Sequence, residues 1–167
     1  MNVIIRRMTL EDVPAVHEID FLSFSLPWPE RSYRFELTGN PVSRGWVAEV
    51  NGRIAAMLVL WLIVDEAHIA TIAVHPDFRR QGIGERILLH SLRSARMEGA
   101  SRAFLEVRAG NVAAQTMYKK YGFVVAGVRP GYYKDNNEDA LLMDLKKFDL
   151  LEAAWTPRKC LPWLRKK

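Results

Sequence analysis

Apolar positions recur with two different periods along this chain, and the change between them predicts its secondary structure. Apolar residues spaced by three or four positions, such as Val13, Val16 and Ile19, predict helices. Short apolar runs between turn residues predict strands. The predicted helices span 9–21, 30–37, 83–98 and 111–121, and the predicted strands span 3–5, 46–50, 53–64, 68–74, 103–107, 123–126, 131–134 and 140–145.

Turn and cap residues set several of these boundaries. Thr9 with Asp12 has the pattern of a capping box at the start of the first helix. Two prolines within 26–29 forbid helix there, so the second helix starts afterwards. Asn51-Gly52 between two apolar runs predicts a hairpin.

The order of the elements predicts the fold class. With 123–126 counted as the start of the strand that leads into the final hairpin, it is β-α-α-β-β-β-α-β-α-β-β, which indicates an α/β domain with a mixed central sheet of about six to seven strands flanked by four helices. A chain of 167 residues is long enough to bury a core as one domain. We place that domain at 1–146 and a C-terminal tail at 147–167.

Composition narrows the cellular setting. The single cysteine, Cys160, excludes an internal disulfide framework and suits a reducing cytosol. The most apolar stretch, 54–64, is far shorter than the roughly 20 residues of a membrane helix, and the N-terminus does not resemble a signal peptide. We expect a soluble cytoplasmic protein with no membrane partner, and we take a monomer as the working expectation.

The net charge of +5 comes from the tail. Residues 155–167 hold five basic and no acidic side chains, so the remaining chain carries 19 of each and is neutral. The tail also contains two tryptophans and two prolines. It is either a solvated basic terminus or a segment that docks on its own domain, an acidic surface or ribosomal RNA.

A glycine-containing run, Arg79-Arg80-Gln81-Gly82-Ile83-Gly84, follows an apolar strand and opens a helix. Glycines let a backbone approach a ligand closely, and the free N–H groups of a helix start attract anions. Taken alone, the run also fits a surface turn before an amphipathic helix. The P-loop and the dinucleotide fingerprint are excluded because their further residues are missing. The run resembles the coenzyme A motif R/Q-x-x-G-x-G/A of the GNAT acetyltransferases, which implies that residues 79–84 and Glu85 bind the cofactor acetyl-CoA.

A second group of residues is more specific. Leu105-Glu106-Val107-Arg108-Ala109-Gly110-Asn111, followed by Tyr118, resembles the ribosomal-protein-alanine N-acetyltransferases of RimI type within that family. The resemblance runs from about Arg7 to Leu145, and it implies a GNAT fold. It also implies that the backbone of Ile72-Ala73-Val74 pairs with the pantetheine arm of the cofactor, which Asn111 and Ala114 also contact.

Two residues are candidates for proton transfer. Strand alternation places Glu106 on the face opposite Leu105 and Val107, where it is either a solvent-facing glutamate or a base. An α-amine, with a pKa near ~8, needs only a modest base. The resemblance implies that Glu106 is the general base. Tyr118 is either a core aromatic residue or, as the resemblance implies, the general acid that protonates the departing thiolate.

The acceptor side rests on the same resemblance. Leu26-Pro27-Trp28 and Tyr132-Tyr133 are similar to the two walls that hold a peptide N-terminus in this family. His68 either relays a proton through water or is a surface residue at a strand end. No spacing typical of a metal site occurs, so we expect none.

Three functions remain open at this stage. The leading one is direct acetyl transfer from acetyl-CoA to the N-terminal α-amine of a protein, with a ribosomal protein as the implied partner. The alternatives are acetylation of a lysine or small amine, and a non-catalytic acyl-CoA-binding module. The module would need neither Glu106 nor Tyr118. Cys160 lies far along the chain from the other candidates and is not expected to be a nucleophile.

Overall fold

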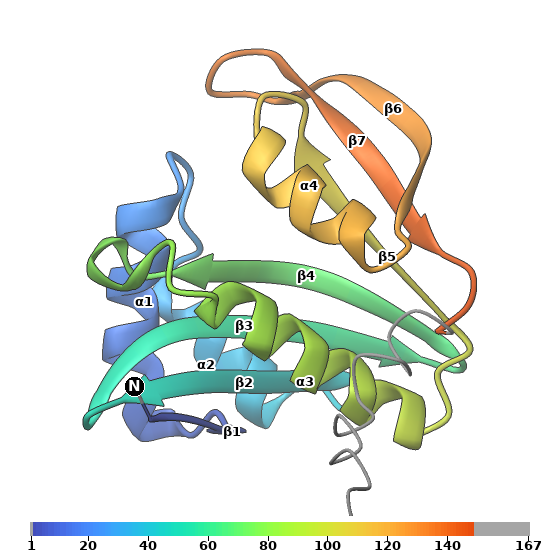
Figure 1. The fold of residues 1–167 in the computed structure, drawn as a ribbon. Helices are drawn as coiled ribbons and strands as arrows, with labels where there is room; N and C mark the ends of the chain where they lie inside the picture. The colour runs from blue at the N-terminus through green and yellow to red at the C-terminus, as the bar shows by residue number, and fades with distance from the viewer. Residues whose placement is uncertain (1, 149–167) are drawn as a thin grey trace, which may run out of the picture.

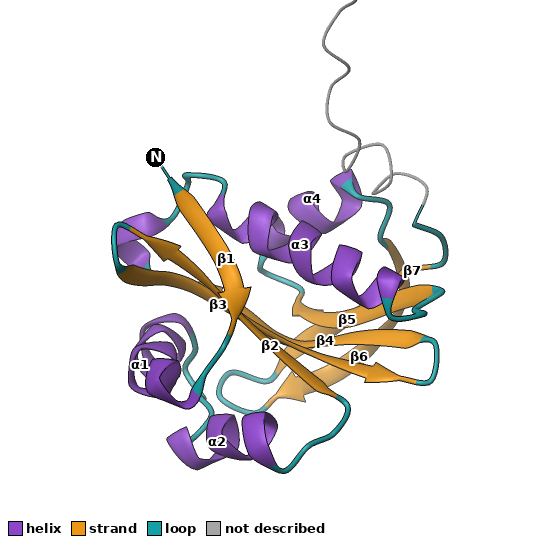
Figure 2. Ribbon diagram, turned by 90° about the horizontal axis from the view of Figure 1, so that it is seen from below, coloured by secondary structure: helices purple, strands orange, loops and turns teal. Residues whose placement is uncertain are grey.

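The computed structural model describes residues 2–148 and shows one seven-stranded sheet with helices on both faces (Figures 1 and 2). The strand order is β1-β2-β3-β4-β5-β7-β6. The strands are β1 Val3–Arg7, β2 Ser43–Val50, β3 Arg53–Ile63, β4 Glu66–Val74, β5 Arg102–Arg108, β6 Val124–Tyr133 and β7 Glu138–Leu145. The helices are α1 Val13–Ser23, α2 Glu30–Thr38, α3 Ile83–Met97 and α4 Val112–Lys120.

The predicted α/β class, the four helices and the mixed sheet are confirmed, with one difference near the C-terminus. The predicted segments 123–126 and 131–134 belong to a single strand, β6, whose pairing with β7 shifts register on the way. Pro130 lies between them and has no N–H to donate. A sheet edge tolerates such a residue, and β6 is an edge strand, so the strand continues through it.

Each face of the sheet has its own apolar core. Val13, Val16 and Ile19 of α1 pack with Tyr33 of α2 against one face. The inward face of α3 packs against the other, together with residues of α4. Figure 2 shows α1 and α2 below the sheet and α3 and α4 above it. Phe148, just past the expected domain boundary, is also buried in the α3 core.

The sheet opens in its centre, between β4 and β5. These neighbours are the parallel pair of the sheet, and their pairing stops at Ile69 and Leu105. Beyond that point β4 continues along β3 to Val74, whereas β5 continues along β7 to Arg108. A bulge at this level of β4, where the register with β3 shifts between Val59 and Leu60, increases the local twist. The two strands therefore diverge toward their C-terminal ends, as Figure 1 shows.

Within residues 2–148, no helix has both the length and the apolar character that a bilayer crossing requires. The basic tail, with Cys160, falls in 149–167 and so lies outside the described residues.

Candidate active site

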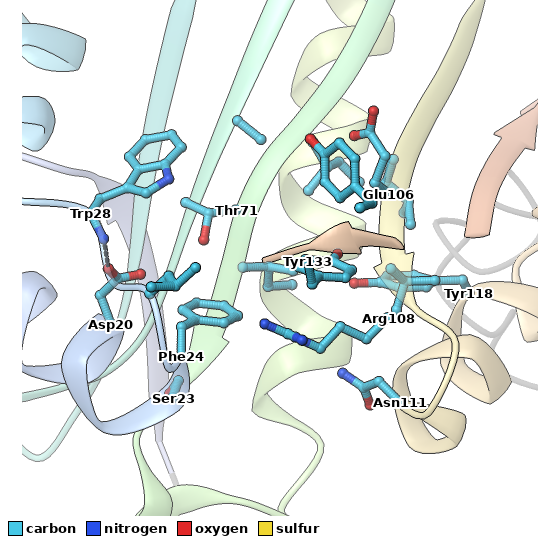
Figure 3. A pocket seen from close by; sticks show the side chains of 17 residues that line it. Asp20, Ser23, Phe24, Trp28, Thr71, Glu106, Arg108, Asn111, Tyr118 and Tyr133 are labelled. Atoms are coloured by element: carbon cyan, nitrogen blue, oxygen red, sulfur yellow. Dashed lines mark hydrogen bonds between the residues drawn. The ribbon is translucent and has the colours of Figure 1, made fainter. Parts of the chain in front are cut away.

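A cavity of about 350 Å³ fills the opening between β4 and β5. Figure 3 shows Trp28 and Phe24 on one side of it, and Glu106, Tyr133 and Tyr118 on the other. Eight of the residues predicted for the site line this cavity: Leu26, Trp28, Ile72, Glu106, Asn111, Tyr118, Tyr132 and Tyr133. Segments distant in sequence thus meet at one place, as the sequence analysis expected.

The remaining predicted residues lie outside the lining. His68 does not line the cavity, but it contacts Glu106, which does. The others are Pro27, Ala73, Val74, Arg79, Arg80, Gln81, Gly82, Ile83, Gly84, Glu85 and Ala114. Seven of these, residues 79–85, form the end of the loop that leads from β4 into α3 and the first turn of α3.

Glu106 points into the cavity because strand alternation turns its neighbours the other way. Leu105 and Val107 are 2% and 5% exposed in the core behind it. The Glu106 Oε2 atom accepts a hydrogen bond from Nε2 of His68 at 3.0 Å, and Oε1 lies 3.5 Å from a guanidinium nitrogen of Arg129. The His68 hydrogen bond is the main reason that the pKa of Glu106 is lower than usual. Glu106 is therefore ionised and able to accept a proton at neutral pH.

His68 is held by aromatic neighbours on adjacent strands. Its ring stacks on Phe104 with centroids 4.5 Å apart and meets the edge of Trp61 at 5.2 Å. These residues are its direct cross-strand partners on β3 and β5. The ring is thus held in place against Glu106.

Tyr118 reaches the cavity from α4 and is only 4% exposed. Burial raises the pKa of its phenol well above the ordinary value. The hydroxyl consequently stays protonated at neutral pH, as a proton donor requires. Asn111 begins the same helix, where its side-chain oxygen accepts a hydrogen bond from the Ala114 N–H at 3.2 Å. The predicted helix cap is confirmed.

The loop before α3 has the geometry of an anion-binding turn. Gly82 is the N-cap of α3 and has a φ of +75°, in the left-handed region, with open space where a Cβ would stand. A Cβ on Gly84 would come within 3.2 Å of the Val74 side chain. The first N–H groups of α3 have no acceptors within the helix. One carboxylate oxygen of Glu85, Oε1, accepts hydrogen bonds from Lys120 and from the Tyr121 hydroxyl.

The edge of β4 presents backbone groups to the opening. The N–H of His75 donates to the Ala55 carbonyl on the β3 side at 2.9 Å. Because backbone groups alternate along a strand, those of Ile72 and Val74 face the opposite side, toward the cavity. The Val74 carbonyl on that side accepts a hydrogen bond from Arg79 Nε at 3.0 Å.

Sequence reasoning missed two ionisable residues of the cavity wall. Asp20 of α1 is 1% exposed and accepts the Trp28 N–H at 2.6 Å, which fixes the start of the next segment (Figure 3). The available signal was its position four residues after Val16, on the apolar face of the helix. Arg108 lies two residues after Glu106, and alternation places both on one face of β5.

Among residues 2–148, no group of three or more His, Cys, Asp or Glu side chains could hold a metal ion.

Comparisons with known proteins agree with this geometry. A model of the acetyltransferase (GNAT) family matches residues 13–123. A putative ribosomal protein bS18-alanine N-acetyltransferase of Bacillus subtilis is 40% identical over 139 residues, which cover 83% of this chain and 92% of that protein. The ribosomal protein bS18-alanine N-acetyltransferase of Escherichia coli K12 is 36% identical over 138 residues, covering 80% and 90%.

Structural similarity points to the same group of proteins. The crystal structure of the ribosomal-protein-S18-alanine N-acetyltransferase from Escherichia coli matches with a TM-score of 0.80 at 33% identity, covering 86% of this chain and 93% of that one. Ard1 from Thermoplasma volcanium matches with a TM-score of 0.78 at 28% identity, covering 88% and 99%. With its fold, its opened sheet and its family match, this chain belongs to the GNAT family of acetyltransferases.

Proposed function

We propose that this protein transfers the acetyl group of acetyl-CoA to the N-terminal α-amine of a protein that begins with alanine, as its relatives named for ribosomal protein bS18 do. The observation that carries the proposal is the placement of Glu106, hydrogen-bonded to His68, in the same cavity as Tyr118. A pure binding module has no use for this pair. We propose that the acceptor protein is ribosomal protein bS18, for which those relatives are named.

The residues present fit acetyl-CoA, which supplies the acetyl group as a thioester. The backbone groups of Ile72 and Val74 face the opening and can pair with the amides of an extended arm. The left-handed Gly82 leaves open space at the start of α3, where the unpaired N–H groups can hold a pyrophosphate. Arg79 and Arg80 add positive charge to this loop.

The proposed chemistry is a direct attack of the amine on the thioester carbonyl. The amine nitrogen forms a bond to the carbonyl carbon, and the bond from that carbon to sulfur breaks. Glu106 accepts the proton that the amine loses, directly or through one water. Tyr118 donates its phenolic proton to the departing sulfur. Its burial keeps the proton in place until the sulfur carries negative charge.

His68 has two proposed roles in this scheme. It holds the Glu106 carboxylate in one orientation, and its imidazole, which has two ring nitrogens, can pass the accepted proton onward. The ring is fixed between Phe104 and Trp61, so this orientation does not depend on bound substrate.

The proposed acceptor walls are the segment around Trp28 and the hairpin that carries Tyr132 and Tyr133. All three residues line the cavity, and Leu26 extends the first wall with an apolar side chain that is 61% exposed. These walls favour a peptide N-terminus as the acceptor rather than a small amine, because aromatic side chains offer both apolar area and hydroxyl groups to a polypeptide.

The test is to incubate the full chain with acetyl-CoA and two peptides. One begins with alanine and contains one internal lysine; the other is identical but N-terminally blocked. Tandem mass spectrometry locates the acetyl group. Acetyl on the free N-terminus only is the expected result. Acetylated lysine would move the protein to the alternative acceptor class, and binding of acetyl-CoA without either product would indicate a binding module or another amine.

A further inference from the structure

Arg108 lines the cavity and makes several contacts at its mouth, although the chemistry proposed above gives it no role. Its guanidinium donates to both carboxylate oxygens of Asp135 at 2.9 and 3.1 Å and to Oε2 of Glu138 at 3.1 Å. It also donates to the Ser25 hydroxyl at 3.3 Å. Its carbon Cζ lies 3.9 Å from the centre of the Tyr133 ring. One side chain therefore touches two segments that are far apart in sequence: the loop that holds Ser25, and the β6–β7 hairpin at residues 133–138.

These two segments belong to the proposed acceptor walls. Ser25 belongs to the α1–α2 loop, residues 24–29, and Asp135 belongs to the β6–β7 turn, residues 134–137. The Ser25 hydroxyl also donates to Asp135 directly. Arg108, Ser25 and Asp135 thus form a closed set of contacts, which we call the latch, joining one wall to the other. Figure 3 shows Arg108 extending from its strand toward the side where Phe24 and Ser23 lie.

The latch is anchored on a rigid base. The side-chain nitrogen of Gln115 in α4 donates to the carbonyls of Arg108 and Ala109 at 3.1 and 2.8 Å, and Gln115 is buried. Glu138 accepts the Gly110 N–H at 2.7 Å as well as Arg108. The strand that carries Arg108 is therefore fixed, and the two walls are held relative to it.

The two ions of the latch, and Glu138 beside them, are partly shielded from solvent. The side chains of Arg108, Asp135 and Glu138 are 24%, 19% and 21% exposed. One guanidinium nitrogen, Nη2, donates to both Asp135 oxygens and to Ser25, and the other, Nη1, donates to Glu138. Several charges that share partners make a stronger network than an isolated surface ion pair.

We propose that Arg108 is a positioning residue that latches the α1–α2 loop to the β6–β7 turn and thereby restricts the cavity to acceptors that enter by a chain end. This inference rests on the proposed function and adds a determinant of its selectivity. A lysine within a polypeptide carries chain on both sides of the reacting residue, whereas an N-terminus carries chain on one side only. When the two walls are joined across the cavity mouth, a chain end can still enter, whereas an internal lysine with chain on both sides is excluded.

The test compares wild type with Arg108→Gln and Asp135→Asn, which break the latch from opposite sides, using the two peptides above. We expect the KM for the free-N-terminus peptide to rise roughly tenfold in each variant, because two charge-assisted hydrogen bonds are lost. The Kd for acetyl-CoA stays unchanged, and acetylated lysine appears in both peptides.

Two further variants serve as controls. Arg108→Lys restores little of the lost selectivity, because an ammonium cannot donate to all these acceptors at once. Arg34→Gln, which removes an exposed ion pair with Glu30, is the matched control and behaves as wild type.

Amide hydrogen exchange of the same variants tests the latch without relying on activity. Faster exchange in both 24–28 and 131–137 is expected, since each wall loses its tie to the other. Unchanged exchange in 24–28, or an unchanged KM and lysine fraction despite loss of the contact, would overturn the proposal. A wild-type enzyme that acetylates no N-terminus is a different result, because it refutes the proposed function and leaves the exchange experiment to decide on the latch.

Discussion

The two sides of the opening between β4 and β5 contribute in different ways. The β4 side offers backbone groups: the free edge at Ile72 and Val74 and the turn at Gly82. The β5 side offers side chains, led by Glu106 and Arg108. Both sides come from one sheet, and they separate because strand pairing ends at Ile69 and Leu105.

The difference matters for how each side tolerates change. A backbone group stays in place when its side chain is replaced, so only changes that alter the main-chain conformation should disturb the β4 side. A side-chain group is lost with a single substitution. We therefore expect the β4 side to set affinity for acetyl-CoA, and the β5 side to set the rate of transfer through Glu106 and the choice of acceptor through Arg108.

The largest effect is expected for Glu106→Gln. The amide keeps the shape of the carboxylate but cannot accept a proton, so kcat/KM for the alanine peptide should fall by about 10²–10³-fold. Steady-state kinetics with peptide and acetyl-CoA measure this, with circular dichroism to check folding. Activity within threefold of wild type would remove Glu106 from the mechanism.

Tyr118→Phe should produce the next largest effect. Loss of the proton donor should reduce kcat by roughly 10- to 100-fold. The Kd for acetyl-CoA should not change, because the ring remains in the core beside Phe123. Burial raises the pKa of the phenol, so the wild-type rate should show no loss from Tyr118 ionisation up to about pH 9. A Kd that rises in parallel with the fall in kcat would assign Tyr118 to binding instead.

Gly82→Ala tests the backbone side of the comparison. A φ of +75° costs an L-residue roughly 1–2 kcal/mol, and relaxation of the turn should raise the Kd for acetyl-CoA up to about tenfold. The kcat at saturation should be retained. Gly99→Ala is the matched control, because Gly99 also has a positive φ and open space around it but lies at the far end of α3. Equal Kd changes in both variants would mean that general destabilisation, not the turn, is measured.

His68→Ala should have a smaller effect with a defined sign. The His68 hydrogen bond lowers the pKa of Glu106, so its removal raises that pKa. The acid limb of the rate profile, which follows ionisation of Glu106, then moves to higher pH. Carbon NMR of labelled glutamate measures the carboxyl titration directly. A pKa that falls or stays constant would contradict the assigned contact.

The smallest effect is expected for Ile72→Val. Ile72 lines the cavity, yet its contribution is its backbone, and a β-branched replacement keeps the strand conformation. Both kcat and the Kd for acetyl-CoA should remain within about twofold of wild type. A tenfold loss in either would show that the β4 side acts through side chains as well.

The sequence predicted the parts of the site that depend on local pattern. Gly82 at a helix start and Asn111 as a helix cap are local features, and both were found where expected. Strand alternation correctly turned Glu106 away from the core. The fold class followed from the order of the elements because each short connection limits where the next element can pack.

Other parts depend on contacts between distant segments and could not be read from local pattern. The latch joins Ser25, Arg108 and Asp135, which are spread over 110 positions of the chain. The separation of β4 from β5 depends on a bulge, and an inserted residue in one strand is not visible as a change in apolar pattern. The role of each candidate residue came from the family resemblance and is what the variants above test.

The most direct test of the division between the two sides is one experiment on four proteins: wild type, Gly82→Ala, Glu106→Gln and the double variant. Calorimetry gives the Kd for acetyl-CoA, and single-turnover kinetics at saturating acetyl-CoA give the rate of N-terminal acetylation. Our account predicts that Gly82→Ala changes only the Kd, that Glu106→Gln changes only the rate, and that the double variant shows both changes at their single-variant size. A Glu106→Gln enzyme that keeps the wild-type rate, or that loses acetyl-CoA affinity as much as Gly82→Ala does, would contradict it.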